Sequence, residues 1–457
     1  MPRLLIVSAH FPPVNTPDMQ RVRMSLPHFV DAGWEVVVLT VDDHEPIAPL
    51  EPELLATVPR AVIIVRTPIF SRRWTRWLGI NNLGLRSLPF LHRAGARLLR
   101  RERFDVVYFS TTQFILMPLG RLWRREFGVP YVIDLQDPWL SDYYSQPGAP
   151  RPPGGWKYFF AQVSARLFEG WTLRRAAHVL SVSSSYLDTL RRRYAWFGGN
   201  YSSVLTFGAP DADFILARAR HGSQPRLLPA TPTLKIAYAG RLGPDIQPAL
   251  ETLFAAVAML RHSARPIELF FFGSSYAPVA QARATTTEIA ARHGIGHLVH
   301  EHPARIGYLD SLRLLLESDL CLLLGSSDRA YSPSKVYPTL YAGRPAVALA
   351  PAGSVLESLL EELGGAALVR FQPGAHSDPA AAAQLAELFR RFSTHPADPL
   401  GPPPDTARLE AKYTAAAIAA QQLAIFNAII SLQHPDHAPL RNSEYWSALP
   451  ESPPHQP

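Results

Sequence analysis

The amino-acid sequence predicts an α/β protein with two doubly wound parallel sheets, each in a domain of its own. Short apolar runs rich in β-branched residues alternate with helical patterns along most of the 457 residues. This alternation is typical of parallel strands covered by helices on both faces. It stops at residues 215–233, a stretch rich in Pro, Arg and small residues, and then begins again. A chain of this length is long enough for two or three domains.

Seven strands are expected in the first half of the chain. The first is followed by a helical pattern at residues 19–33, which Gly33 closes, so that the second strand completes a β-α-β unit. Another helical pattern lies at residues 118–128. The expected strands are residues 4–9, 35–41, 61–67, 105–111, 131–137, 177–183 and 202–208.

The second half repeats the pattern with other residues. Helical patterns lie at residues 250–262, 285–294 and 311–318, and one long helical pattern covers residues 405–432. From about His434 the chain lacks apolar periodicity. The expected strands are residues 234–240, 267–273, 298–303, 319–325 and 346–352.

The composition excludes several classes of protein. The net charge of +7 favours anionic partners such as phosphates, nucleotides or a membrane surface, although an Arg-rich composition without a partner gives the same charge. The only cysteine, Cys321, lies in an apolar run, so a disulfide framework is excluded, and no histidine spacing indicates a metal site. No nucleic-acid recognition motif accompanies the charge. Without a signal peptide or an apolar run of roughly 18 residues, we expect a cytoplasmic protein and no transmembrane helix.

Candidate ligand-binding residues follow the strands of the second domain, because doubly wound sheets bind ligands outside the carboxyl ends of their strands. Gly240 and Arg241 come directly after one strand. Glycine lets the backbone approach a ligand closely, and arginine can bind a phosphate through two hydrogen bonds. Gly273 and Ser274 follow the next strand. Each pair is also compatible with an ordinary turn at the protein surface.

The segment SPSK at residues 332–335 is typical of a helix start. Lys335 is unfavourable for the helix itself, which makes sense if an anion binds there. Ser334 and Lys335 are therefore candidates for binding a diphosphate together with Arg241, and the alternative is an exposed lysine on a solvated face. Pro338 requires either that the helix begins near Ser334 or that it is kinked.

These motifs resemble those of GT-B glycosyltransferases, closest to the retaining family 4, also called group 1. The resemblance covers roughly residues 3–430. It is carried by HFPP (10–13), DAGWEVVVLT (31–40), VPYVIDLQDPW (129–139), IAYAGRLG (236–243) and SPSKVYPTLYAGRPAVALAPAGS (332–354).

The resemblance implies a GT-B fold with two Rossmann-like domains facing a cleft. Residues 1–214 would form the acceptor-side domain and residues 234–410 the nucleotide-sugar-binding domain, joined by the linker at residues 215–233. Residues 411–432 would form a helix that returns to the first domain, followed by a flexible tail at residues 433–457.

The family also suggests roles for the donor-side residues. Arg241 and Lys335 match basic residues that bind the donor diphosphate. Many members carry two glutamates eight positions apart, of which the second binds the donor ribose, but Ala330 and Pro338 stand at those positions here. Glu357 is a possible substitute for the missing ribose contact.

The first domain supplies candidates for the acceptor side. Thr111 or Thr112 stands where many family members place a histidine near the reacting sugar. His10 follows the first strand and is expected to point into the cleft. Asp134 and Asp137 lie at a strand end, where a carboxylate can orient an acceptor hydroxyl or stabilise positive charge. We expect a structural role for Asp134, and leave Asp137 open between catalysis and holding a loop.

Two arginines of the following helix, Arg21 and Arg23, are candidates for binding the acceptor or a phosphate, with plain surface arginines as the alternative. Segments 69–104 and 156–178 mix arginine with Trp, Leu and Phe. They suit an anionic membrane surface, or else arginine-coated helices packed on the sheet.

We therefore expect a retaining, metal-independent glycosyltransferase without a cofactor, using a UDP- or GDP-sugar and a saccharide or lipid-linked acceptor. Such an enzyme would act at the inner face of the membrane, in envelope or exported polysaccharide synthesis. The missing glutamates and histidine leave an alternative, a catalytically silent relative that binds a nucleotide sugar or a partner enzyme as a scaffold. A sugar-nucleotide epimerase of the same fold is a further alternative.

Overall fold

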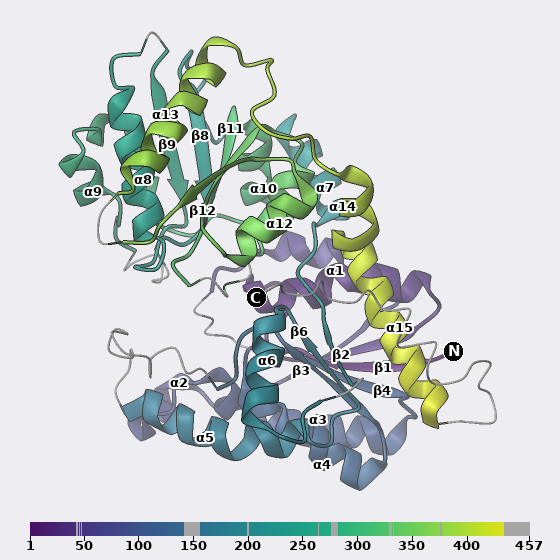
Figure 1. The fold of residues 1–457 in the computed structure, drawn as a ribbon. Coiled ribbons are helices and arrows are strands. Elements are labelled where there is room, and N and C mark those ends of the chain that lie inside the picture. The colour runs from purple at the N-terminus through teal and green to yellow at the C-terminus, as the bar shows by residue number, and fades with distance from the viewer. Residues whose placement is uncertain are drawn as a thin grey trace. The chain divides into compact units, whose positions relative to one another are not determined.

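The structure, a computed structural model, divides into two compact units. It describes residues 1–433 except residues 43, 45, 47, 141–155, 199–200, 264, 276–281, 329–330, 332 and 375–376. The first unit contains residues 1–206 and the chain from residue 418 onward, and the second contains residues 207–417. Figure 1 shows one parallel sheet with covering helices in each unit.

The first unit is built on a seven-stranded sheet in the order β3-β2-β1-β4-β5-β6-β7, with every pairing parallel. Its central strands are buried over their whole length because helices cover both faces. The strands are β1 (Arg3–Val7), β2 (Glu35–Val41), β3 (Ile63–Thr67), β4 (Val106–Ser110), β5 (Tyr131–Leu135), β6 (His178–Ser181) and β7 (Ser202–Val204).

Two hydrophobic cores lie on the two faces of this sheet. Leu91, Trp123 and Leu173 belong to one core, and Phe29 and Phe426 belong to the other. The helices are α1 (Pro17–Asp31), α2 (Arg72–Thr75), α3 (Leu83–Arg101), α4 (Pro118–Phe127), α5 (Trp156–Leu173), α6 (Ser184–Arg193) and α15 (Ala415–Gln433), with 3-10 turns η1 (Pro52–Thr57), η2 (Arg76–Leu78) and η3 (Phe114–Leu116).

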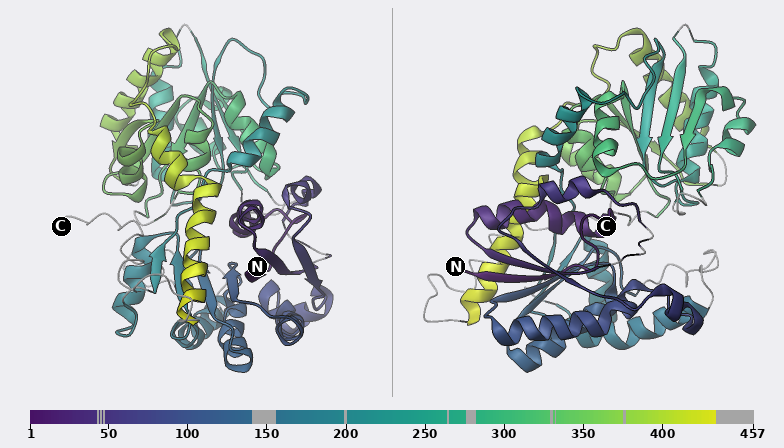
Figure 2. Two further views of the ribbon diagram at one scale, coloured as in Figure 1. Left: turned by 90° about the vertical axis from the view of Figure 1, so that its right-hand side faces the viewer. Right: turned by 180° about the vertical axis from the view of Figure 1, so that it is seen from behind.

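The helix α15 packs into the first unit although it comes from the far end of the chain (Figures 1 and 2). Phe426 is fully buried and its ring lies 6.0 Å from that of Phe29 and 5.3 Å from that of Tyr108. Gln422 donates to the Tyr108 hydroxyl and accepts from Ser25. By length and composition alone α15 could cross a membrane, contrary to the sequence-based expectation, but this buried face is that of a core helix.

The second unit is built on a six-stranded parallel sheet in the order β10-β9-β8-β11-β12-β13. The strands are β8 (Leu234–Ala239), β9 (Ile267–Phe272), β10 (Val299–His302), β11 (Leu320–Leu324), β12 (Ala346–Pro351) and β13 (Ala367–Phe371). The helices are α7 (Asp211–His221), α8 (Gln247–Met259), α9 (Thr287–Arg292), α10 (Tyr308–Glu317), α11 (Val336–Tyr341), α12 (Val355–Leu363), α13 (Pro379–Thr394) and α14 (Thr406–Tyr413), with the 3-10 turn η6 (Gly296–Leu298).

Some expected boundaries differ in the structure. The segment expected as a linker, residues 215–233, lies inside the second unit, and its first residues belong to α7. The long helical pattern at residues 405–432 is interrupted at Thr414, whose extended backbone separates α14 from α15. The strand β13 was not expected. The tail expected to be flexible lies outside the described residues from residue 434 onward.

Candidate functional site

Lys335 lies directly over Gly240, the residue that follows β8. Gly240 has a φ of 150°, and a Cβ atom placed on it would lie 1.8 Å from Lys335 Nζ. The ammonium group donates a hydrogen bond of 3.1 Å to the Tyr238 hydroxyl and lies 4.7 Å from the centre of that ring. The absence of a side chain at Gly240 is therefore what lets Lys335 cross the carboxyl end of β8.

Arg241 follows Gly240 in the sequence and is fixed by a bidentate ion pair. Its guanidinium donates to both carboxylate oxygens of Asp245, at 2.5 and 3.0 Å. Asp245 also accepts from the Ser326 hydroxyl at 2.9 Å, which ties the end of β8 to the loop after β11. Arg241 is about one-third exposed, so a ligand can reach its guanidinium. Both basic residues expected at the donor site are therefore at the carboxyl edge of the second sheet.

The helix after Lys335 begins late enough to accommodate its proline. The first residue of α11 is Val336, so Pro338 lies in the first turn, where no backbone N–H is needed for the helix. The carbonyl of Lys335 accepts from the Thr339 N–H at 3.1 Å. Of the two explanations for Pro338, a late helix start is correct. Ser334 precedes this helix without capping it by a side-chain hydrogen bond.

The other donor-side candidates serve the fold of the second unit. Gly273 has a φ of 69° at the end of β9. Ser274 was expected to contact the donor. Its hydroxyl is buried and donates to Glu301, so it is not available to a ligand. Ala330, one of the two positions that replace the family's glutamates, lies outside the described residues.

Glu357 is a helix cap. The Ser354 hydroxyl accepts from the Glu357 N–H at 3.3 Å, and the Glu357 carboxylate accepts from the Gly353 N–H at 2.5 Å. Arg370 pairs with the other carboxylate oxygen. Burial raises the pKa of Glu357, but these hydrogen bonds outweigh it and the pKa is lowered. Because both oxygens are engaged, the expectation that Glu357 binds the ribose is not supported by its geometry.

A small polar cluster forms after β1 and β4 of the first unit. His10 Nδ1 lies 3.0 Å from the Asp18 carboxylate, which also accepts from the Thr112 N–H and hydroxyl at 3.3 and 3.1 Å. The Thr111 hydroxyl lies 3.5 Å from the same oxygen. Burial alone would raise the pKa of Asp18, but His10 and these hydrogen bonds lower it to about 2. The structure thus brings His10 and Thr111 together around a carboxylate that was not among the candidates.

Asp137 follows β5, and part of its side chain is open to solvent. Enough of the protein lies around the carboxyl group to reduce its hydration. This desolvation, together with the negative charge of Asp18, raises the pKa of Asp137 to about 6. A carboxylate that titrates near neutral pH can exchange protons with a hydroxyl group. The structure leaves Asp137 accessible for such a role.

Arg21 and Arg23 are buried, which corrects their expected role in binding an acceptor. Arg21 Nε lies 3.2 Å from the Asp134 carboxylate, and its Nη2 donates to the Leu205 carbonyl at 2.9 Å. Arg23 donates to Gln20 and to Thr57, each at 2.8 Å. The structural role expected for Asp134 agrees with its complete burial and its hydrogen bonds from Tyr108 and Ser110.

Comparison with known proteins gives a sequence match within the first unit and a likeness in fold over nearly the whole chain. Residues 20–198 match the family model of the glycosyl transferase 4-like domain. No curated protein matches the chain.

Three solved structures illustrate the likeness in fold over nearly the whole chain. Sucrose-phosphate synthase from Thermosynechococcus elongatus has a TM-score of 0.60 at 18% identity, covering 94% of this chain and 100% of that one. Trehalose 6-phosphate synthase from Burkholderia multivorans has a TM-score of 0.59 at 14% identity, covering 95% and 100%. Anabaena HepE in complex with UDP-glucose has a TM-score of 0.53 at 14% identity, covering 95% and 99%.

The two parallel sheets, their order and these likenesses confirm the expected α/β GT-B fold. The whole chain therefore shares the fold of these glycosyltransferases, and residues 20–198 match the glycosyl transferase 4-like domain by sequence.

Proposed function

We propose that the protein transfers a sugar from a nucleotide-diphosphate donor to a saccharide or lipid-linked acceptor, with retention of configuration and without a metal ion. The observation that carries this proposal is the placement of Lys335 over Gly240, next to Arg241, at the carboxyl edge of the second sheet. Two cations at the edge where doubly wound sheets bind ligands suit a diphosphate.

The chemistry needs stabilisation of the negative charge that develops on the leaving diphosphate. An ammonium and a guanidinium fixed by Tyr238 and Asp245 are held in place before the reaction, so little reorganisation is needed. Arg241 would share its guanidinium between Asp245 and the phosphate. The donor we propose is a UDP-sugar, since Anabaena HepE was solved with UDP and with UDP-glucose.

On the acceptor side, we assign the proton-transfer or hydroxyl-orienting role to Asp137. Its raised pKa, near 6, lets the carboxylate accept a proton from a hydroxyl more readily than an ordinary aspartate. His10 and Thr111 lie around Asp18 in the same unit and would help to position the acceptor.

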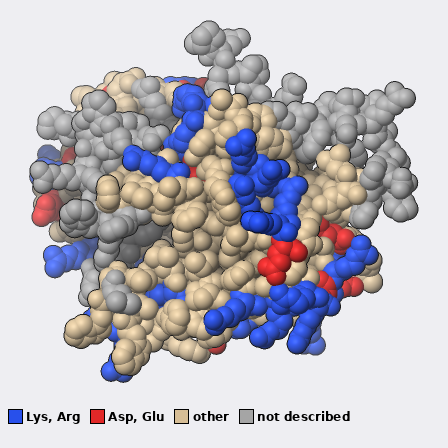
Figure 3. Space-filling view, turned by 90° about the horizontal axis from the view of Figure 1, so that it is seen from below, with Lys and Arg blue, Asp and Glu red and all other residues tan. Residues whose placement is uncertain are grey.

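The reaction would take place at the inner surface of an anionic membrane, in the synthesis of envelope or exported polysaccharide. Trp74 and Trp77 are 80% and 90% exposed, and Arg72, Arg73 and Arg76 accompany them in α2 and η2. Tryptophan prefers the boundary of a membrane, and arginine its phosphate headgroups. The face seen from below in Figure 3, on the side of α3, α4 and α5, displays many Lys and Arg side chains and few acidic ones.

The test is thermal denaturation with UDP, GDP and ADP and their glucose-bearing forms, on wild type and Lys335→Ala. We expect selective stabilisation by the uridine compounds, lost in the variant. Lys412→Ala is a matched control, because Lys412 also lies over a tyrosine ring in the second unit, at 4.9 Å. If no nucleotide stabilises the wild-type protein, the transferase proposal fails and a scaffold role takes its place.

A further inference from the structure

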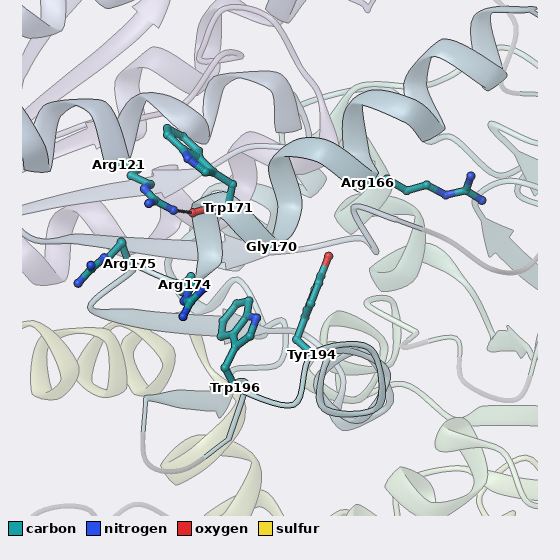
Figure 4. Close-up of a pocket in the computed structure, with 8 residues that line it drawn as sticks. All are labelled: Arg121, Arg166, Gly170, Trp171, Arg174, Arg175, Tyr194 and Trp196. Atoms are coloured by element: carbon teal, nitrogen blue, oxygen red, sulfur yellow. Dashed lines mark hydrogen bonds between the residues drawn. The ribbon is translucent and has the colours of Figure 1, made fainter.

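A pocket rich in arginine and aromatic side chains lies on the first unit, between the C-terminal half of α5, the start of α4 and the segment after α6 (Figure 4). Its volume is about 570 Å³, within the range of small-molecule sites. Its lining contains no acidic side chain and consists of Arg121, Arg166, Gly170, Trp171, Arg174, Arg175, Tyr194 and Trp196.

One of these arginines has a structural task. Arg121 donates to the Trp171 carbonyl, and its guanidinium lies 4.3 Å from the centre of the Trp171 ring. Arg124, outside the pocket, donates in the same way to the Arg175 carbonyl. These bonds satisfy carbonyls near the C-terminus of α5, where cations are favourable. Helix capping therefore accounts for Arg121.

Unlike Arg121, the other three arginines of the pocket, Arg166, Arg174 and Arg175, have no helix-capping role for their guanidinium groups. Within the described part of the chain they form no ion pair and no side-chain hydrogen bond. The carboxylate that lies nearest in sequence, Glu169, is buried and engaged by Arg193, the Tyr194 hydroxyl and the Leu140 N–H. Figure 4 shows Arg166 extending away from Arg174 and Arg175, which lie together at the other end of the pocket. Nothing described in the pocket offsets the positive charges of Arg174 and Arg175.

The aromatic rings give the pocket a second property. Tyr194 and Trp196 are stacked, with ring centres 5.1 Å apart, and the side chain of Trp171 is partly exposed. Gly170 lets Tyr194 approach α5, since a Cβ there would lie 2.9 Å from the ring. Partly exposed rings beside cations can pack against the apolar face of a sugar or similar ring while the cations bind its anionic group.

We propose that this pocket binds a phosphate-bearing ligand, with the phosphate held by Arg174 and Arg175 and the adjoining ring or headgroup resting on Trp171, Tyr194 and Trp196. Charge-assisted hydrogen bonds from arginine supply the recognition. The ligand is either a soluble sugar phosphate or the headgroup of an anionic lipid, which share this chemistry. The site lies on the first unit and does not depend on the proposed transfer reaction.

The test compares Arg174→Ala/Arg175→Ala with the control Arg261→Ala/Arg283→Ala, which removes the same charge from exposed positions of the second unit. All proteins carry Lys335→Ala, so that the proposed donor site does not contribute. One arm measures binding of inorganic pyrophosphate and of glucose 6-phosphate by calorimetry. The other measures cosedimentation with vesicles of phosphatidylcholine containing 30% phosphatidylglycerol.

A loss of at least tenfold in affinity for the phosphates, confined to the pocket variant, supports a soluble phosphate ligand. A comparable loss confined to vesicle binding supports a lipid headgroup. Equal losses in the control variant, or no loss in either arm, overturn the proposal. The melting temperature of each variant shows that the substitutions leave the protein folded.

Discussion

At the scale of single residues, the position of Lys335 depends on Gly240. Gly240→Ala would push the ammonium group away, because the new Cβ and Lys335 Nζ cannot both occupy the space. We expect about tenfold weaker UDP binding by calorimetry, the loss of roughly one charge-assisted hydrogen bond. Gly343→Ala is the control, since Gly343 also has a positive φ of 69° but a Cβ there meets nothing within 4 Å. Equal effects of the two substitutions would point to backbone strain instead.

The raised pKa of Asp137 predicts that the transferase activity depends on pH. Since its pKa is raised to about 6, the carboxylate is protonated below that pH and ionised above it. We expect kcat/KM to rise as the pH passes through about 6, and Asp137→Asn to lower activity by about a hundredfold or more and remove this rise. A raised carboxyl pKa means that stability is lost as the pH increases from 3.8 to about 6, so the variant should be no less stable at pH 7. A variant with an unchanged pH profile would exclude this role.

Sequence patterns identified candidate residues after strands but could not tell engaged side chains from available ones. Arg21 and Lys335 are both basic residues that come after a strand, in or just before the next helix. Arg21 is paired with Asp134 in the interior, whereas Lys335 is half-buried at the sheet edge. The difference depends on partners far away in the sequence. Asp18 was missed for a related reason, because an acidic residue in the first turn of a helix is an ordinary capping pattern.

At the scale of elements, Glu357 stabilises the start of α12 and was expected instead to bind the donor ribose. Glu357→Ala removes the carboxylate that caps α12 and pairs with Arg370. We expect a loss of about 1 kcal/mol in the free energy of unfolding, the usual cost of a lost cap, and unchanged UDP affinity. Glu361→Ala is the control, as it removes the second acidic partner of Arg370, which is exposed, without touching the cap. A weaker UDP affinity for Glu357→Ala alone would restore the ribose-binding interpretation.

Element existence was predictable and element boundaries were not. The apolar runs gave most strands of both sheets because buried parallel strands are continuous in hydrophobicity. Pro338 left two possibilities that only the observed start of α11 at Val336 decides. No Gly or Pro stands near Thr414, so the sequence predicted one continuous helix where the structure has two.

At the scale of the whole molecule, composition located two domains but not the path of the chain between them. The Pro- and Arg-rich stretch at residues 215–233 looked like a linker, yet Arg313 binds the Gln224 side chain and the Pro225 carbonyl, and Glu317 accepts from the N–H groups of Leu227 and Leu228. These contacts anchor the stretch on α10 inside the second unit. Such anchoring depends on two residues almost a hundred positions away, which local composition does not reveal.

The first unit is discontinuous, so it should depend on the last described helix for its stability. A chain that ends at residue 417 lacks the part of α15 that carries Phe426, and leaves the apolar face around Phe29 uncovered. Loss of one buried Phe side chain costs about 3–5 kcal/mol, and whole domains are stable by only about 5–15 kcal/mol. We expect the first unit to be unfolded in this truncated chain while residues 207–417 fold normally. Calorimetry should show one cooperative transition fewer than in the full chain, and uridine diphosphate should still stabilise the transition that remains. Persistence of both transitions would show that α15 is dispensable for the fold.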